Sequence, residues 1–135
     1  MGKDEYSEDD LVQAPTAQLL ADELGWQTCF ALDEGGFGPD SLLGRASDKE
    51  VVLTREVMAA LRRLNPGLPE AAYAEALAVV VRDDITKDLI RQNQEKYALL
   101  RDGAEVKVRD AQGRVNARRL RLIDFDQPDQ NRYLA

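Results

Sequence analysis

The hydrophobic periodicity of the chain changes at Gly103, and this change constrains the fold more than any other feature of the sequence. Before Gly103, apolar residues recur at intervals of three and four, as they do on amphipathic helices. After it, valines at positions 106 and 108 alternate with Lys107 and Arg109, as in a half-buried strand. We therefore predict helices followed by a β-hairpin: an α/β class of fold, with an α+β arrangement in these 135 residues.

The first helix should begin at Glu8, because Ser7 suits the N-cap position before it. Pro15 lacks an amide hydrogen and should kink this helix. Its end is expected near Leu24, because Gly25 readily takes the left-handed conformation that stops a helix.

The apolar segment WQTCFAL, residues 26–32, follows this helix and predicts a buried strand. We expect the first helix to pack on the sheet that contains it. Cys29 lies in this segment, and the chain has no histidine to activate a thiol. Cys29 is therefore interpreted as a core residue and not as a nucleophile.

Three further helices are predicted before Gly103. Thr54 should cap the second, which ends at the segment NPGLP, and Pro69 should lie in the first turn of the third. The fourth should run from about residue 85 to residue 100. We expect the third and fourth to form a second helical layer through two apolar stripes: Tyr73, Ala76, Leu77, Val80 and Val81, and Ile85, Leu89, Ile90, Tyr97 and Leu100.

The predicted hairpin turns at the segment DAQG, residues 110–113. In the returning strand, Val115 and Ala117 share one face, whereas Leu120 and Leu122 lie on the other. A bulge or bend near Arg118–Arg119 would let both pairs be buried, and we expect one there.

Charge is unevenly distributed along the chain, whose net charge is −7. Residues 1–50 carry twelve acidic against three basic side chains, and residues 91–123 carry nine basic against four acidic ones. An acidic protein binds DNA only where cations gather locally. In the second of these segments, the residues that could supply such a surplus are Lys107, Arg109, Arg114, Arg118, Arg119 and Arg121. Arg118, Arg119 and Arg121 are therefore candidate nucleic-acid contacts, although charges that protect strand edges from aggregation are the simpler interpretation.

Composition excludes several classes of protein. With one cysteine and no histidine, the chain has no disulfide framework, no multi-cysteine zinc site and no histidine general base. No apolar run approaches the roughly 18 residues of a membrane span, and the N-terminus MGKDEYSEDD lacks the apolar region of a signal peptide. A soluble protein of the reducing cytoplasm, without membrane partners, is expected.

Two motifs suggest ligand binding but have simpler interpretations. Gly35, Gly36 and Gly38 lack the spacing and the Lys-Ser/Thr ending of phosphate-binding loops, so they predict a surface loop. Asp124 and Asp126 share one side of an extended segment and are of the type that binds magnesium. The segment DFDQPD is nevertheless more typical of a turn, because Asp and Pro favour turns.

Glu8 has two interpretations that the local sequence leaves open. It could be a catalytic carboxylate, or it could favour the positive end of the helix dipole together with Asp9 and Asp10. The run SEDD by itself favours the second interpretation.

Five segments, in this order, resemble the beginning of the restriction (R) subunit of type I restriction-modification enzymes. They are YSEDDLVQAPTAQLLADELGW, LGR, VVLTREVMAALRRLNPGLPEAAYAEAL, NQEKYALLRDGAEV and LRLIDFDQPDQNRY. The resemblance covers nearly the whole chain. It implies a PD-(D/E)xK nuclease domain, with a mixed sheet flanked by helices, followed in the parent protein by an ATP-driven DNA translocase.

The resemblance also implies cofactors, partners and one site residue. The parent enzyme would cut foreign DNA with Mg²⁺ and ATP, in a prokaryotic cytoplasm, together with methylation (M) and specificity (S) subunits. Glu8 matches an acidic residue near the start of the first helix that faces the metal, which makes it a candidate catalytic and metal-binding residue.

The family's catalytic Asp and Glu-x-Lys are expected after Ala135. Residues 1–135 would then be the N-terminal portion of the nuclease domain, truncated before the catalytic strands and inactive alone. The alternative is a non-catalytic docking module with the same architecture.

Overall fold

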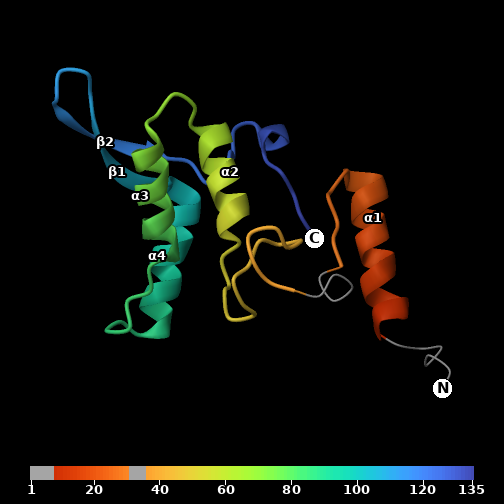
Figure 1. Cartoon of the computed structure of the whole chain (residues 1–135). Helices are drawn as coiled ribbons and strands as arrows, with labels where there is room; N and C mark the ends of the chain where they lie inside the picture. Colours follow the sequence, from red (N-terminus) through yellow and green to blue (C-terminus); the bar gives the residue numbers. More distant parts are fainter. Residues whose placement is uncertain (1–7, 31–35) are drawn as a thin grey trace. The chain divides into compact units, whose positions relative to one another are not determined.

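The chain forms two compact units (Figure 1). The first unit comprises residues 1–36 and 132–135, and the second comprises residues 37–131. The computed structural model describes residues 8–30 and 36–135, without the side chains of Asp9 and Asp10. Ser7, Gly35 and the end of the segment WQTCFAL lie outside the described residues.

The first unit contains the predicted N-terminal helix in two parts. A π-helical part, η1 (Asp9–Gln13), leads into the α-helix α1 (Ala14–Leu24). The geometry changes from π-helical to α-helical next to Pro15, which has no hydrogen to donate. The kink expected at Pro15 stays a prediction. Gly25 ends the helix as predicted: its φ is 67°, and its amide donates to the Ala21 carbonyl at 3.1 Å.

The segment after α1 is extended and pairs with the last residues of the chain. Gln27 forms a parallel bridge with Leu134, and the Cys29 amide donates to the Ala135 carbonyl at 2.9 Å. The rings of Trp26 and Tyr133 stack with centroids 5.2 Å apart. The predicted buried strand is thus a short, half-buried parallel pair, and Cys29 is half-buried too.

The expected packing of the first helix on a sheet is not found among the described residues. The segment 26–30 belongs to a single bridge and not to a multi-stranded sheet. Consistent with this, α1 has no buried residue.

The second unit contains three helices followed by a hairpin, which confirms the α+β arrangement. The helices are α2 (Thr54–Leu64), α3 (Glu70–Val81) and α4 (Leu89–Asp102). The antiparallel strands are β1 (Ala104–Arg109) and β2 (Val115–Leu120), joined by the predicted turn. A short 3₁₀ helix, η2 (Pro128–Gln130), follows. No helix in the described part of the chain is long and apolar enough to span a bilayer.

Two helix starts differ by one residue from the prediction. Thr54 is the first residue of α2 and not its cap, because Leu53 holds the N-cap position. The Thr54 hydroxyl instead donates to Glu50 at 3.3 Å. Pro69 holds the N-cap position of α3, just before the first turn.

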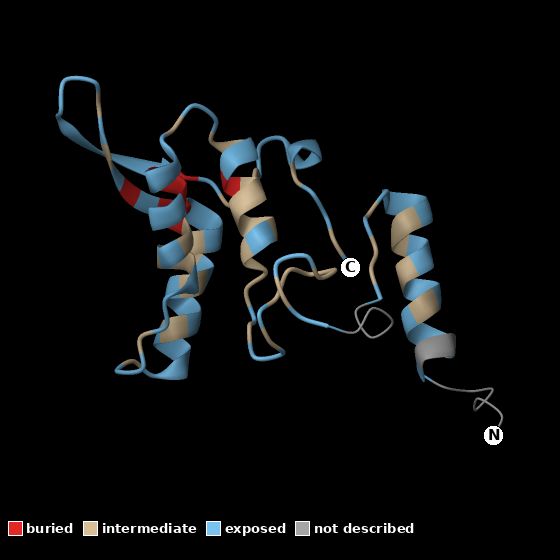
Figure 2. Cartoon of the chain, in the orientation of Figure 1, coloured by how far each residue is buried: buried red, intermediate tan, exposed pale blue. Residues whose placement is uncertain are grey.

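The core of the second unit lies where one face of the hairpin meets α3 and α2. Figure 2 shows its buried residues near the base of the hairpin and on the adjoining helices. Contacts join α3 to β1 and α2 to α3. The buried hydrophobic residues are Leu61, Ala72, Tyr73, Ala76, Ala104, Val106 and Leu120.

The predicted bulge near Arg118–Arg119 is wrong. Every residue of β2 faces one residue of β1, from Ala104 opposite Leu120 to Arg109 opposite Val115. Val115 and Ala117 are exposed, so no bulge is needed to bury them.

The predicted apolar stripe of α4 is also wrong. Its members are 47% to 94% exposed, and the helix begins four residues later than expected, with Asp88 as its cap. The partly buried side of α4 instead carries Leu99, which packs against the core, and Lys96. The Lys96 ammonium donates to the carbonyls of Val80 and, at 2.6 Å, Arg82, which lie at the end of α3 and would otherwise lack partners.

Candidate nucleic-acid interface

The register of the hairpin assigns its side chains to two faces. Residues directly opposite each other in an antiparallel pair lie on the same face. The inner face, toward α3, begins at the buried Ala104, Val106 and Leu120 and continues outward to Val108, Asn116 and Arg118. The outer face carries Glu105, Lys107, Arg109, Val115, Ala117 and Arg119. Arg118 and Arg119 therefore point to opposite sides.

Arg119 lies directly across from Glu105 and forms an ion pair with it. The guanidinium and carboxylate are 3.7 Å apart, and both side chains are about three-fifths exposed. The pKa of Asp102 is below its usual value, chiefly because Arg101 donates to its carboxylate, with a smaller attraction from Arg119. The positive charge of Arg119 is thus shared between two acidic neighbours.

Arg121, just beyond β2, is engaged by the acidic turn that follows it. Its guanidinium lies 3.4 Å from Asp124 and 3.5 Å from Asp126. The side-chain amide of Asn65 holds its backbone on both sides, accepting from the Arg121 amide at 2.7 Å and donating to its carbonyl at 2.9 Å. The backbone of Arg121 is therefore held in place, and its charge is partly neutralised.

Asp124 organises the turn that contains it. Its carboxylate accepts from the amides of Asp126 at 3.0 Å and Gln127 at 2.9 Å. Asn131 closes the loop with two bonds of 2.8 Å to the Asp124 backbone. These contacts support the turn interpretation of this segment over the metal-site interpretation.

The glycine-rich loop likewise uses its polar groups internally. The Gly38 amide donates to the Arg45 carbonyl at 2.7 Å, and the Gly38 carbonyl accepts from the Ser41 hydroxyl at 2.6 Å. Arg55 donates to the carbonyls of Ser41 at 2.9 Å and Leu42. The described part of this loop is thus at the surface, as predicted, and these hydrogen bonds brace it.

Three cations of the hairpin have no carboxylate partner within the described residues: Lys107, Arg109 and Arg118. All three are exposed. Arg118 lies directly opposite the buried Val106 on the inner face, but its own side chain is exposed. Lys107 and Arg109, which the sequence includes among the cations that could contact nucleic acid, share the outer face of the hairpin.

Glu8 is helical and exposed, next to η1. It belongs to the first unit, whereas the candidate arginines belong to the second. In the described part of the chain, no three acidic, cysteine or histidine side chains converge as metal ligands. Glu8 and the other described acidic side chains do not by themselves make up a magnesium site.

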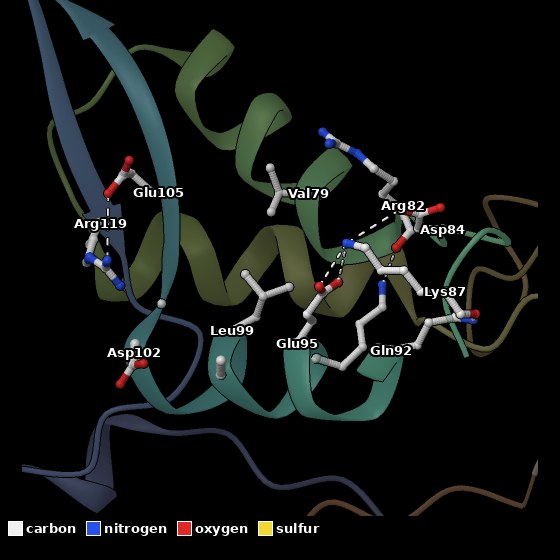
Figure 3. A pocket seen from close by; sticks show the side chains of 13 residues that line it. Val79, Arg82, Asp84, Lys87, Gln92, Glu95, Leu99, Asp102, Glu105 and Arg119 are labelled. Carbon is white, nitrogen blue, oxygen red and sulfur yellow. Dashed lines mark hydrogen bonds and ion pairs between the residues drawn. The ribbon is translucent and has the colours of Figure 1, made fainter. Parts of the chain in front are cut away.

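A charged groove of about 530 Å³ lies beside the base of the hairpin (Figure 3). Lys87 lies in it between Glu95, at 2.8 Å, and Asp84, at 3.4 Å. The hydrogen bond to Glu95 is the main reason why the pKa of Lys87 is raised. Glu105 and Arg119 line the groove at the hairpin. Because these charges pair with one another, the groove offers an anion little net attraction.

A family comparison decides the relationship of the chain to known proteins. The family model described as type I restriction enzyme R protein N terminus matches residues 5–135. The chain belongs to this family. It is 34% identical over 133 residues to the type I restriction enzyme HindI endonuclease subunit of Haemophilus influenzae.

The family relationship covers the N-terminal region of a much larger protein. The aligned residues are 96% of this chain but 12% of the length of the HindI endonuclease subunit. No solved structure gives a significant match. Membership of the R-protein N-terminal family therefore rests on sequence similarity.

Proposed function

We propose that the chain forms the N-terminal part of the DNA-cleaving subunit of a type I restriction enzyme. The observation that carries this proposal is the family match over residues 5–135, supported by the similarity to an endonuclease subunit. The intact complex would cut foreign DNA with Mg²⁺ and ATP in the prokaryotic cytoplasm. Methylation and specificity subunits would be its partners.

We further propose that the domain is related to the PD-(D/E)xK nucleases. The resemblance of the five segments and the family match over residues 5–135 support this. In this proposal Glu8 contributes to catalysis and metal binding. Arg118, Arg119 and Arg121 contribute to the DNA-binding surface, with the last two partly neutralised by acidic neighbours.

A chimeric enzyme tests the proposed function. The aligned N-terminal segment of the HindI endonuclease subunit is replaced by this chain, and the product is assembled with methylation and specificity subunits. We expect the chimera to cut unmodified plasmid only when both ATP and Mg²⁺ are present. A chimera that assembles and hydrolyses ATP but leaves the plasmid intact would contradict the proposal.

The alternative, a docking module without chemistry, has one observation in its favour. An apolar groove of about 670 Å³ lies in the second unit, and several aliphatic side chains line it. They include Val51, Leu53, Val57, Val80, Leu99 and Leu122. The same chimera separates the two functions, because a docking module would restore assembly without restoring cleavage.

A further inference from the structure

The hairpin extends beyond the helices that hold its base. Ala104, Val106 and Leu120 at the base are buried, whereas residues 111–119 are all exposed. Figures 1 and 2 show the far half of β1 and β2 and their turn projecting past α3. We call residues 104–120 the arm. Its outer half contributes little to the core, so its sequence is free to serve another purpose.

The tip of the arm is held in a defined conformation. The Asp110 carboxylate accepts from the amides of Gln112 and Arg114, both at 2.9 Å, and from the Arg114 side chain at 2.8 Å. Two backbone bonds of 2.9 Å also close the turn. A two-stranded ribbon is marginal without such support. The cations beside the turn are therefore presented on an ordered scaffold.

The arm is basic in an acidic chain. From residue 104 to residue 121 there are six basic and two acidic side chains, against a net charge of −7 for the whole chain. Both acidic side chains are engaged, Glu105 by Arg119 and Asp110 by Arg114. Arg121, just past the arm, is engaged by Asp124 and Asp126. Among the described residues, the cations without a carboxylate partner are then Lys107, Arg109 and Arg118.

Protection against edge-to-edge aggregation does not account for this pattern. Charges of either sign on a strand edge prevent pairing with other chains. Here the unpaired charges are all positive and lie on both faces of a projecting ribbon. Such an arrangement is suited to a partner that carries a regular array of negative charges.

We propose that the arm binds the phosphate backbone of duplex DNA through Lys107, Arg109 and Arg118. This inference rests on the proposed function, because that function is the reason for naming DNA as the anionic partner. A two-stranded ribbon fits the major groove of B-DNA, and cations on its two faces can then reach the phosphates on either side. The arm has no aromatic residue on which unpaired bases could stack, which favours duplex over single-stranded DNA.

Fluorescence anisotropy of a labelled duplex tests the arm in the 135-residue chain. The arm variant replaces its three unpaired cations: Lys107→Gln, Arg109→Gln and Arg118→Gln. The matched control removes one lysine and two arginines elsewhere in the second unit: Lys49→Gln, Arg82→Gln and Arg91→Gln. These three are also exposed, so both variants change the net charge equally.

We expect the arm variant to bind the duplex at least roughly tenfold more weakly than the control at low salt. Between about 50 and 200 mM salt, its slope of log affinity against log salt should be smaller by about 1 for each phosphate that the variant no longer neutralises. A conservative variant, Lys107→Arg, Arg109→Lys and Arg118→Lys, should retain binding. Circular dichroism and urea midpoints that match the wild type will show that each variant is folded.

Three results would overturn the inference. They are equal affinity of the arm and control variants, no salt-dependent binding by the wild-type chain, and displacement of the duplex by poly-glutamate as efficiently as by unlabelled DNA. The last would assign the arm to an acidic protein. None of them bears on cleavage by the chimeric enzyme, so the arm can fail while the proposed function stands.

Discussion

Gly103 joins α4 to β1 in a conformation that is essentially restricted to glycine. Its φ is 89° and its ψ is 170°. A Cβ atom at this position would lie 2.6 Å from the Leu120 carbonyl oxygen. The residue at which the hydrophobic periodicity changes is thus also one where the backbones of the two strands approach too closely for a side chain.

We predict that Gly103→Ala lowers the free energy of unfolding by roughly 3 kcal/mol, because backbone strain and a steric clash combine. Gly113→Ala is the matched control: its φ is 78°, but nothing lies within 4 Å of the added methyl group. Strain alone should cost the control about 1 kcal/mol. Urea denaturation measures both. Equal losses would show that the close approach to Leu120 has no energetic weight.

At the scale of the elements, the hairpin turn depends on one ionised carboxylate. The pKa of Asp110 is below its ordinary value of 3.8, chiefly because the Arg114 amide donates to it. A group with a lowered folded pKa stabilises the fold above its unfolded pKa. That contribution is lost as the pH falls through the folded pKa.

We therefore predict that Asp110 titrates below 3.8 and that the turn opens in the same range. Carboxyl chemical shifts in an NMR titration give the pKa, and amide exchange at Gln112 and Arg114 reports the turn. Arg114→Gln should leave the pKa lowered, because the backbone bond remains. A midpoint at or above 3.8 in the wild type would contradict the assignment.

The elements were predictable where a local residue determines them. The helices α1 and α4 end at Gly25 and Gly103, because glycine readily takes the backbone conformations found there. The change of helical geometry lies next to Pro15, which lacks an amide hydrogen. The buried face of each helix was harder to predict, because the hydrophobic period identifies an apolar stripe but not whether another element packs against it. In α4 the partly buried side carries Leu99, which packs against the core, and Lys96, which bonds to the end of α3, whereas the predicted apolar stripe is exposed.

The candidate site was predictable to a similar degree. Charge distribution correctly pointed to the basic hairpin, but not to which cations are neutralised. Arg119 and Arg121 have acidic partners across the strand and in the following turn, and such partners follow from register and loop closure. Lys107 and Arg109 belong to the predicted basic segment but not to its three named contacts, and strand protection is the simpler interpretation of all these charges from the sequence alone.

At the scale of the whole molecule, we predict that the 135-residue chain alone does not cut DNA. Metal-dependent hydrolysis of a phosphodiester needs several oxygen ligands around the ion and a positioned water, and Glu8 is one carboxylate. The assay incubates plasmid with the purified chain and Mg²⁺ or Mn²⁺. Cleavage that persists through purification and disappears in Glu8→Ala would contradict this prediction.

The first unit is discontinuous in sequence, and this has a consequence for the order of folding. Gln27 and Leu134, which pair in it, are separated by more than a hundred residues that include the entire second unit. Joining them in an unfolded chain requires closing a long loop, at an entropic cost that grows with its length. Once the second unit has folded, the effective loop is shorter. The second unit should therefore fold first, and the parallel pairing of the two chain segments should be among the last contacts to form and the first to break.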